Sequence, residues 1–302
     1  MTSGILPDAP FGRVLTAMVT AFDDDGGVDL EATARVAEYL VAHGHDGVVV
    51  SGTTGESPTT STEEDGLLLR AVLEAVGDRA TVVAGVGTND TAHSVELAAQ
   101  AEKLGAHGVL VVSPYYNKPT QAGLAAHFEA VADASGLPVM LYDIPGRTGV
   151  TIAPQTYRRV AAHERVVAVK DAVGDLARGV AIMAETGLSY YSGDDVLNLG
   201  WLTHGGCGIV SVVGHVAGDH YRAMVDAVDR GDLASALATY RALVPVVDAV
   251  MTTAQGAMTA KAALELLGVL PNRRVRLPLV AADEPLVDHL REVLTRADLL
   301  TP

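Results

Sequence analysis

The sequence predicts a (β/α)8 (TIM) barrel followed by a C-terminal helical extension. Short runs rich in β-branched apolar residues alternate eight times with longer, amphipathic, Ala-rich segments, which is the pattern of βα units that form a parallel sheet. The 302 residues suffice for one barrel of roughly 200 to 250 residues plus an appendage. Hydrophobic residues make up 49% of the chain and aromatic residues only 4%, so Val, Leu, Ile and Ala would fill a core between helices and a parallel sheet.

The predicted strands are short and apolar, and the predicted helices between them are longer and amphipathic. The strand candidates are Val14–Thr20, Gly47–Ser51, Thr81–Gly85, Gly108–Ser113, Pro138–Tyr142, Val166–Lys170, Ser189–Ser192 and Gly208–Val212. The helix candidates are Asp29–His43, Thr62–Val76, Thr91–Leu104, Thr120–Ser135, Pro154–Ala161, Leu176–Glu185, Asp194–His204 and Val216–Arg230. Ser61 with Glu64 has the pattern of a capping box. An open doubly wound sheet shares the βαβ repeat and stays an alternative on this pattern.

The strand signal stops after Arg230, and the rest of the chain is helical. Leu233–Val250, Ala254–Leu267 and Glu284–Ala297 are the helix candidates there. We therefore expect a catalytic barrel over residues 1–230 and a helical domain over residues 231–302, to which the sequence assigns only packing or assembly.

Charge and cysteine content exclude several classes of function. The formal charge of −16 argues against nucleic-acid or anionic-membrane partners, because both are bound chiefly through Lys and Arg. The single cysteine, Cys207, allows no intramolecular disulfide and no Cys-based zinc site within one chain. Met1–Arg13 has no signal-peptide pattern, and the longest apolar runs fall short of the roughly 20 residues of a membrane helix. We expect a cytoplasmic location.

Polar residues follow several predicted strands, and in a parallel barrel the C-terminal strand ends form the active site. These segments are Ser51–Glu56, Ser113–Asn117, Tyr142–Arg147, Lys170-Asp171 and Gly193–Asp195.

Lys170 is the most informative of these residues. Only four of the 21 basic residues are lysines, and Lys170 alone closes an apolar strand candidate, Val166–Val169. Burial in a barrel would lower the pKa of its amine and leave a neutral nucleophile for a carbonyl, as an imine-forming enzyme requires. A lysine extending to solvent from a strand end is the alternative. The other three, Lys103, Lys118 and Lys261, are expected to be ordinary lysines of a helix, a loop and the C-terminal helical segment.

The neighbouring strand ends add groups that suit such chemistry. Tyr142 would lie beside Lys170 and relay protons if Thr53 or Thr54 hydrogen-bonds to it, although a lone Tyr at a strand end more often has a packing role. The Gly52–Gly55 turn gathers backbone N–H groups and hydroxyls into a cradle for a small carboxylate. Arg147 would bind a second carboxylate, or is simply solvated. No cluster with metal-ligand spacing follows these strands, so no metal is expected.

These segments together resemble the dihydrodipicolinate synthase (4-hydroxy-tetrahydrodipicolinate synthase) family of pyruvate-dependent aldolases. The resemblance is carried by Gly52–Glu56, Pro114–Asn117, Tyr142–Gly149, Lys170-Asp171 and Gly193–Asp195, and it extends over essentially the whole chain. The double tyrosine and the Arg-Thr-Gly segment favour this family over its sialic-acid-lyase relatives.

The resemblance implies a reaction and a role for each site residue. Lys170 would form a Schiff base with pyruvate, without any further cofactor, and the enamine would attack aspartate 4-semialdehyde in diaminopimelate and lysine biosynthesis. Tyr142, Thr53 and Tyr116 match the proton relay, with Tyr116 reaching in from an adjacent subunit.

The same resemblance implies the substrate contacts and the assembly. Thr54 and the main chain of Val210 match positions that contact pyruvate, and Arg147 matches the residue that receives the semialdehyde carboxylate. Gly193 is also expected to belong to the substrate-binding site. The family's usual assembly is a homotetramer built from two tight dimers, so we expect a homo-oligomer.

The sequence departs from the family at the site that binds the feedback inhibitor lysine. Asn89 and Tyr115 agree with that site, whereas Thr62, Asp65 and His93 replace two histidines and a glutamate. Weak or absent inhibition by lysine follows as an expectation. A sugar-acid (2-keto-3-deoxy) aldolase or dehydratase using the same lysine is the main rival function, and a catalytically silent barrel used for binding is the second.

Overall fold

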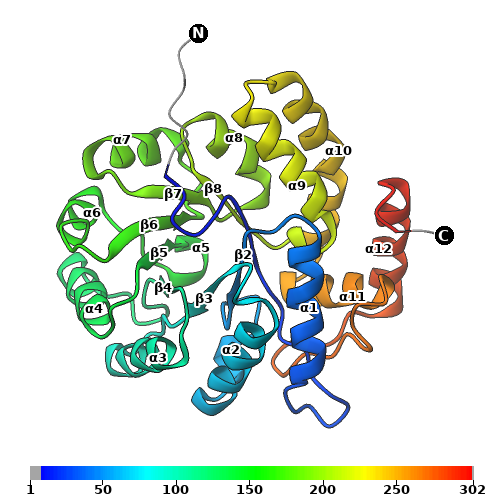
Figure 1. Cartoon of the computed structure of the whole chain (residues 1–302), viewed down its shortest axis with the longest axis horizontal. Coiled ribbons are helices and arrows are strands. Elements are labelled where there is room, and N and C mark those ends of the chain that lie inside the picture. The colour runs from blue at the N-terminus through cyan, green and yellow to red at the C-terminus, as the bar shows by residue number, and fades with distance from the viewer. Residues whose placement is uncertain (1–7, 301–302) are drawn as a thin grey trace.

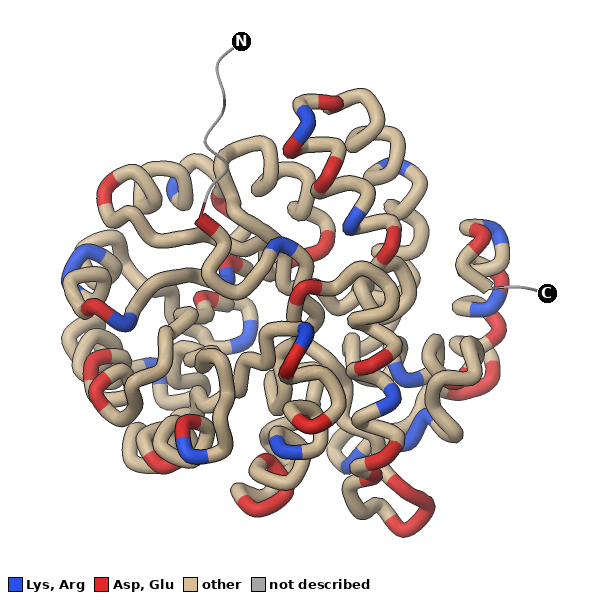
Figure 2. The backbone as a smooth tube through the Cα atoms, viewed as in Figure 1, with Lys and Arg blue, Asp and Glu red and all other residues tan. Residues whose placement is uncertain are grey.

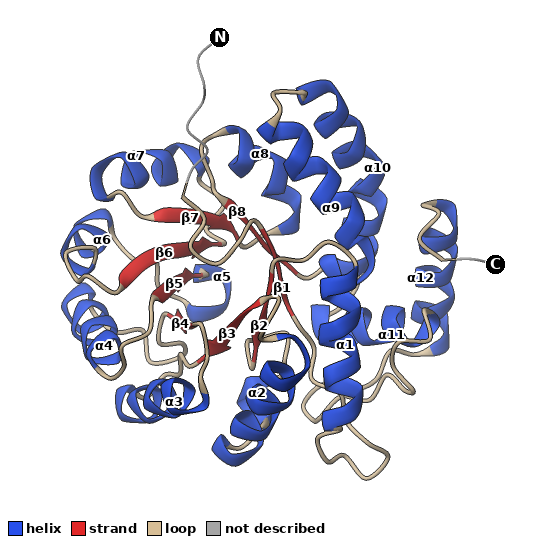
Figure 3. Ribbon diagram, in the orientation of Figure 1, coloured by secondary structure: helices blue, strands red, loops and turns tan. Residues whose placement is uncertain are grey.

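The computed structural model describes residues 8–300 and contains a closed barrel of eight parallel strands in sequential order. Figures 1 and 3 show the strands at the centre with helices around them. The strands are β1 (Val14–Ala17), β2 (Gly47–Val50), β3 (Thr81–Gly85), β4 (Gly108–Val112), β5 (Val139–Asp143), β6 (Val166–Asp171), β7 (Ser189–Ser192) and β8 (Gly208–Ser211). Because β1 pairs with both β2 and β8, the sheet has no free edge, and the open-sheet alternative is excluded.

Helices connect the strands in the predicted order. Those of the barrel are α1 (Leu30–Ala42), η1 (Ser57–Thr59), α2 (Thr62–Val76), α3 (Thr91–Leu104), α4 (Gln121–Asp133), α5 (Pro145–Thr148), α6 (Pro154–Val160), α7 (Leu176–Thr186), η2 (Asp195–Leu197), α8 (Asn198–Thr203) and α9 (Gly214–Asp229). The capping box of Ser61 and Glu64 is formed at the start of α2.

Three helical regions differ from the prediction. The expected helix Asp194–His204 is divided into the 3-10 helix η2 and the α-helix α8. The 3-10 turn η1 was not anticipated, nor was the single turn α5. Pro145 begins it, and Gly149 ends it with φ 73°; proline suits the first helical position and glycine the left-handed position after the last.

Two apolar layers form the barrel core, as expected for a parallel sheet buried on both faces. Side chains pointing inward fill the interior, including Leu15, Met140, Ala168 and Val210. The larger outer layer packs the opposite strand faces against α1 to α4 and α6 to α8. Asp and Glu are spread over the outer helices and loops in Figure 2.

The C-terminal extension consists of α10 (Leu233–Met251), α11 (Gly256–Leu266) and α12 (Glu284–Arg296), close to the predicted bounds. Most of its buried apolar residues share one cluster with α9 and with Val14 and Ile209 of the barrel, whereas Ala260 and Leu264 of α11 belong to the outer barrel layer. The extension packs chiefly on α9, which itself packs on β1. A domain boundary at residue 230 stays a prediction.

Within the described residues, one helix, α10, is long and apolar enough to cross a membrane, judged by length and composition alone. Its most apolar window has a mean hydropathy of 1.4 and is 33% buried, and the helix carries Arg241 and Asp248. Helices in the cores of soluble proteins meet the same criterion, so this is weak evidence for a membrane span.

Candidate active site

Lys170 and Tyr142 lie side by side at the C-terminal end of the barrel. They are register partners on the parallel strands β6 and β5, and Lys170 Nζ is 4.3 Å from the centroid of the Tyr142 ring. The two residues are only 4% and 6% exposed. The inward direction predicted from the apolar strand pattern therefore brings an amine and a phenol together.

Burial makes Lys170 a better nucleophile than a surface lysine. Loss of solvation lowers the pKa of Lys170 to about 8; Asp195 opposes this shift and Arg147 adds to it. At pH 8 about half of such amines are neutral, against less than about 1% for an ordinary lysine. Burial also raises the pKa of the Tyr142 phenol, so this phenol keeps its proton at neutral pH and is able to donate it.

A cavity of about 350 Å³ opens above this pair and brings six predicted site residues together. These are Thr53, Thr54, Tyr142, Arg147, Lys170 and Gly193. Met251 and Thr252 at the end of α10 also line the cavity. The end of α10 thus forms part of the cavity wall, which the sequence did not predict.

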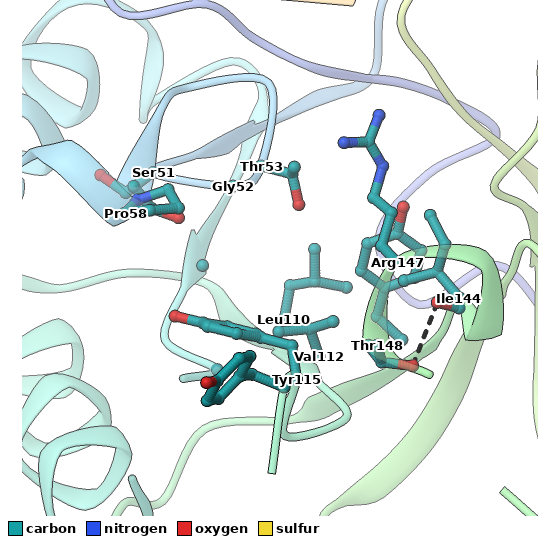
Figure 4. Close-up of a pocket in the computed structure, with 15 residues that line it drawn as sticks. Ser51, Gly52, Thr53, Pro58, Leu110, Val112, Tyr115, Ile144, Arg147 and Thr148 are labelled. Carbon is teal, nitrogen blue, oxygen red and sulfur yellow. Dashed lines mark hydrogen bonds between the residues drawn. The ribbon is translucent and has the colours of Figure 1, made fainter. Parts of the chain in front are cut away.

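An adjoining cavity of about 400 Å³ shares Thr53, Tyr142 and Arg147 with the first and extends to Tyr115 and Tyr116. Figure 4 shows Thr53 across from Arg147, with Tyr115 at the other end of the space. Together the two cavities offer room for two small substrates next to Lys170.

Hydrogen bonds to carbonyl oxygens on either side of Thr53 fix the turn after β2. Ser57 N–H donates to the carbonyl oxygen of Gly52 at 3.3 Å, and the Thr20 hydroxyl donates to the carbonyl oxygen of Gly55 at 2.7 Å. A Cβ on Gly85 would lie 2.4 Å from the carbonyl oxygen of Ser51, so only glycine allows β3 to pass this close beneath the turn.

Gly193 packs directly on the stem of Lys170. A Cβ at this position would lie 2.8 Å from Lys170 Cγ and 2.9 Å from the carbonyl oxygen of Asp171. Any larger residue would push the lysine from its position, so Gly193 shapes the site through its lack of a side chain.

Two predicted site residues are outside the main cavity. Val210 is 1% exposed and its side chain belongs to the barrel interior, while Val212, two residues later, lines the cavity. Tyr116 is 87% exposed, has a left-handed φ of 72° and lines only the adjoining cavity.

Asp195 is a buried carboxylate that the sequence did not single out. Its oxygens accept hydrogen bonds from the backbone N–H groups of Val212 and Val213 at 2.9 and 3.1 Å, from Tyr221 at 2.9 Å and from Ser211. It therefore fixes the end of β8 that faces Lys170. The second Asp of the Gly-Asp-Asp segment was the available signal.

Asp143 and Asp171 directly follow Tyr142 and Lys170 in the sequence. Asp143 accepts a hydrogen bond from Tyr157 at 3.1 Å, and Arg178 approaches it to 3.7 Å. Burial raises the pKa of Asp143 to about 7 and that of Asp171 to about 6. The two contacts of Asp143 tie α6 and α7 to the end of β5, which carries Tyr142.

Lys261 is not the ordinary lysine that the sequence suggested. It is 1% exposed, and its Nζ donates to Glu56 Oε1 at 2.5 Å. Within residues 8–300, no group of three or more His, Cys, Asp and Glu residues is arranged to hold a metal ion.

The family of the chain follows from comparison with known proteins. A model of the dihydrodipicolinate synthetase family matches residues 10–297. The chain belongs to this family.

Individual members of the family are similar to this chain over nearly its full length. A 4-hydroxy-tetrahydrodipicolinate synthase from Kineococcus radiotolerans is 62% identical over 293 residues, which are 97% of this chain and 95% of that protein. The lysine-bound crystal structure of the synthase from Cyanidioschyzon merolae is similar with a TM-score of 0.93 at 39% identity, covering 97% and 100% of the two chains. The chloride-inhibited synthase from Acinetobacter baumannii, complexed with pyruvate, has a TM-score of 0.91 at 33% identity, covering 97% and 100%.

Proposed function

We propose that the chain condenses pyruvate with L-aspartate 4-semialdehyde to give 4-hydroxy-tetrahydrodipicolinate, in the biosynthesis of diaminopimelate and lysine. The observation that carries the proposal is the buried Lys170 amine beside Tyr142 at the floor of a cavity, in a chain of the dihydrodipicolinate synthetase family.

The reaction begins with attack of the neutral Lys170 amine on the keto carbon of pyruvate. The carbinolamine loses water to give the imine, and loss of a proton from the methyl carbon gives the enamine. The enamine carbon then attacks the aldehyde carbon of the semialdehyde, forming the new C–C bond. The amino group of the second substrate finally attacks the imine carbon, which closes the ring and releases Lys170.

Proton transfers accompany each of these steps, and Tyr142 is in contact with the amine that reacts. In the proposed relay, Tyr142 donates a proton to the carbinolamine oxygen that leaves as water. Thr53 and Tyr116 connect the phenol to the cavity opening, with Tyr116 supplied by an adjacent subunit. An exposed aromatic residue beside the opening suits such an exchange between subunits, and a homotetramer of two dimers is the assembly that we propose.

Each substrate carries a carboxylate, and the cavity offers separate groups for the two. Thr54 and the main chain of Val210 would hold the pyruvate carboxylate near Lys170, and Gly193 would leave room for the substrate beside the lysine stem. Arg147, which lines both cavities, would receive the semialdehyde carboxylate. The covalent Schiff base supplies the electron sink, so the proposed reaction uses no metal or other cofactor, and we propose a cytoplasmic enzyme without membrane or nucleic-acid partners.

A substrate comparison tests the proposal. The purified protein is assayed with pyruvate and aspartate 4-semialdehyde, and separately with 2-keto-3-deoxy sugar acids, with Lys170→Ala as the control. We expect turnover only with the first pair and none with Lys170→Ala. Turnover of the sugar acids alone would select the rival aldolase or dehydratase.

A further inference from the structure

Glu56 is the last residue of the turn that carries Thr53 and Thr54. Residues of the C-terminal extension bind its carboxylate. Glu56 is 3% exposed. Its Oε1 accepts from Nζ of Lys261 at 2.5 Å, and its Oε2 accepts from the backbone N–H of Arg276 at 2.9 Å. Both oxygens are thus engaged by residues more than 200 positions later in the chain.

Lys261 is fixed on more than one side. Its Nζ donates a second hydrogen bond to the carbonyl oxygen of Arg274 at 2.7 Å and lies 4.1 Å from the centroid of the Phe22 ring. Burial lowers the pKa of Lys261, and the Glu56 carboxylate opposes this. Carboxylate, carbonyl and aromatic ring together hold the ammonium ion in one place.

Arg276 joins the same turn to three other segments. Its guanidinium donates to both carboxylate oxygens of Glu64 at 2.8 and 2.6 Å. It also donates to the carbonyl oxygens of Thr59 and Gly26, each at 2.8 Å. The loop before α12 therefore connects the ends of η1, the start of α2 and the loop before α1.

The backbone of Glu56 passes this restraint on to Thr53. Glu56 adopts a left-handed conformation, φ 60° and ψ 32°, which residues with a Cβ rarely adopt unless their surroundings enforce it. Its N–H donates to the carbonyl oxygen of Thr53 at 3.2 Å. Movement of the Glu56 side chain would therefore shift the backbone that presents the two threonine hydroxyls.

We propose that Lys261, together with the backbone N–H of Arg276, is a positioning residue, which holds Thr53 and Thr54 in the geometry that binds the pyruvate carboxylate by fixing Glu56. The inference rests on the proposed function, because it takes a carboxylate substrate as the ligand of this turn. The C-terminal extension is then part of the substrate site. Neither residue contacts Lys170, so the affinity for pyruvate will change more than the rate of imine formation at saturation.

The test uses Glu56→Gln, Lys261→Met and the double variant of the full-length protein. Each is incubated with pyruvate and borohydride, and the reduced adduct is measured by mass as a function of pyruvate concentration. We expect the half-saturating pyruvate concentration to rise about tenfold or more, because small displacements of a binding group are costly. The maximal rate of trapping should stay within about threefold of the wild type.

The double variant keeps the test decisive if a single variant does not fold. Each single change leaves one buried group without its partner, which is strongly destabilising, whereas removing both charges relieves this penalty. The double variant should therefore fold, as judged by circular dichroism, and still show the raised half-saturating concentration.

Arg273→Met is the matched control, because Arg273 pairs with Glu265 at 2.6 Å and with Glu284 in the same extension. It should lower thermal stability without changing the half-saturating concentration. A folded double variant within twofold of the wild type would overturn the inference, and so would an equal rise in Arg273→Met. A wild-type protein that gives no adduct would overturn the proposed function and this inference with it.

Discussion

Replacing Lys170 by methionine is expected to stabilise the protein at neutral pH, and this stabilisation should disappear as the pH rises. Burial lowers the pKa of Lys170 from 10.5 to about 8 in the folded protein, whereas in the unfolded chain the amine is in water. Between pH 8 and 10.5 the unfolded chain therefore binds more protons than the native protein, so the free energy of unfolding of the wild type rises with pH in this window. Methionine does not titrate and lacks this dependence.

The magnitude follows from the two pKa values. At about 1.4 kcal/mol for each unit of difference, the buried amine destabilises the wild type by about 3 kcal/mol below pH 8 and by about 0 above pH 10.5. Methionine fills nearly the same volume, so packing changes should remain below about 1.5 kcal/mol.

Urea unfolding of both proteins at pH 7, 8, 9 and 10 measures the difference. Lys261 is also buried, but its contribution to the free energy of unfolding is the same in both proteins and cancels in the difference. Lys103→Met is the control for loss of an exposed lysine on α3. A Lys170→Met variant less stable than the wild type at pH 7, or a difference that does not change with pH, would refute the reasoning.

Three further predictions concern the proposed reaction. Tyr142→Phe should keep the fold and lower turnover about 100-fold or more, since only the phenolic proton is lost; turnover like that of the wild type would argue against the relay. Gly193→Ala places a Cβ 2.8 Å from Lys170 Cγ and should slow borohydride trapping about tenfold, whereas Gly146→Ala, which meets no atom within 4 Å, should not; equal rates in the two variants would contradict this. L-Lysine should inhibit weakly or not at all, because Thr62, Asp65 and His93 stand where the family resemblance implies two histidines and a glutamate; an inhibition constant in the submicromolar-to-micromolar range in a steady-state assay would show that these residues bind it.

The barrel and the residues at its strand ends could be predicted because both follow from local patterns. Lys170 and Tyr142 each close an apolar run, and side chains alternate in direction along a strand. In a parallel barrel this places both near one end of the interior, which agrees with their register.

Contacts between distant parts of the chain could not be predicted in this way. Lys261 lies on α11, in which eight of the eleven residues are buried, so the helix has no solvent face on which a lysine would lie. Its Ala-rich sequence was a signal of such burial, but the partner Glu56 is 205 positions away. The carboxylate contacts of Asp195 likewise depend on how β8 and α9 pack, which a pattern in one segment does not contain.

The site of covalent attachment tests the central claim most directly. All four lysines lie within residues 8–300, and two of them, Lys170 and Lys261, are buried. Burial lowers the pKa of each to about 8. Only Lys170 faces the cavity, while Lys261 donates to Glu56. Trapping with pyruvate and borohydride, followed by peptide mass mapping, should place the reduced adduct on Lys170 alone. An adduct on Lys261, or none at either lysine, would contradict the account.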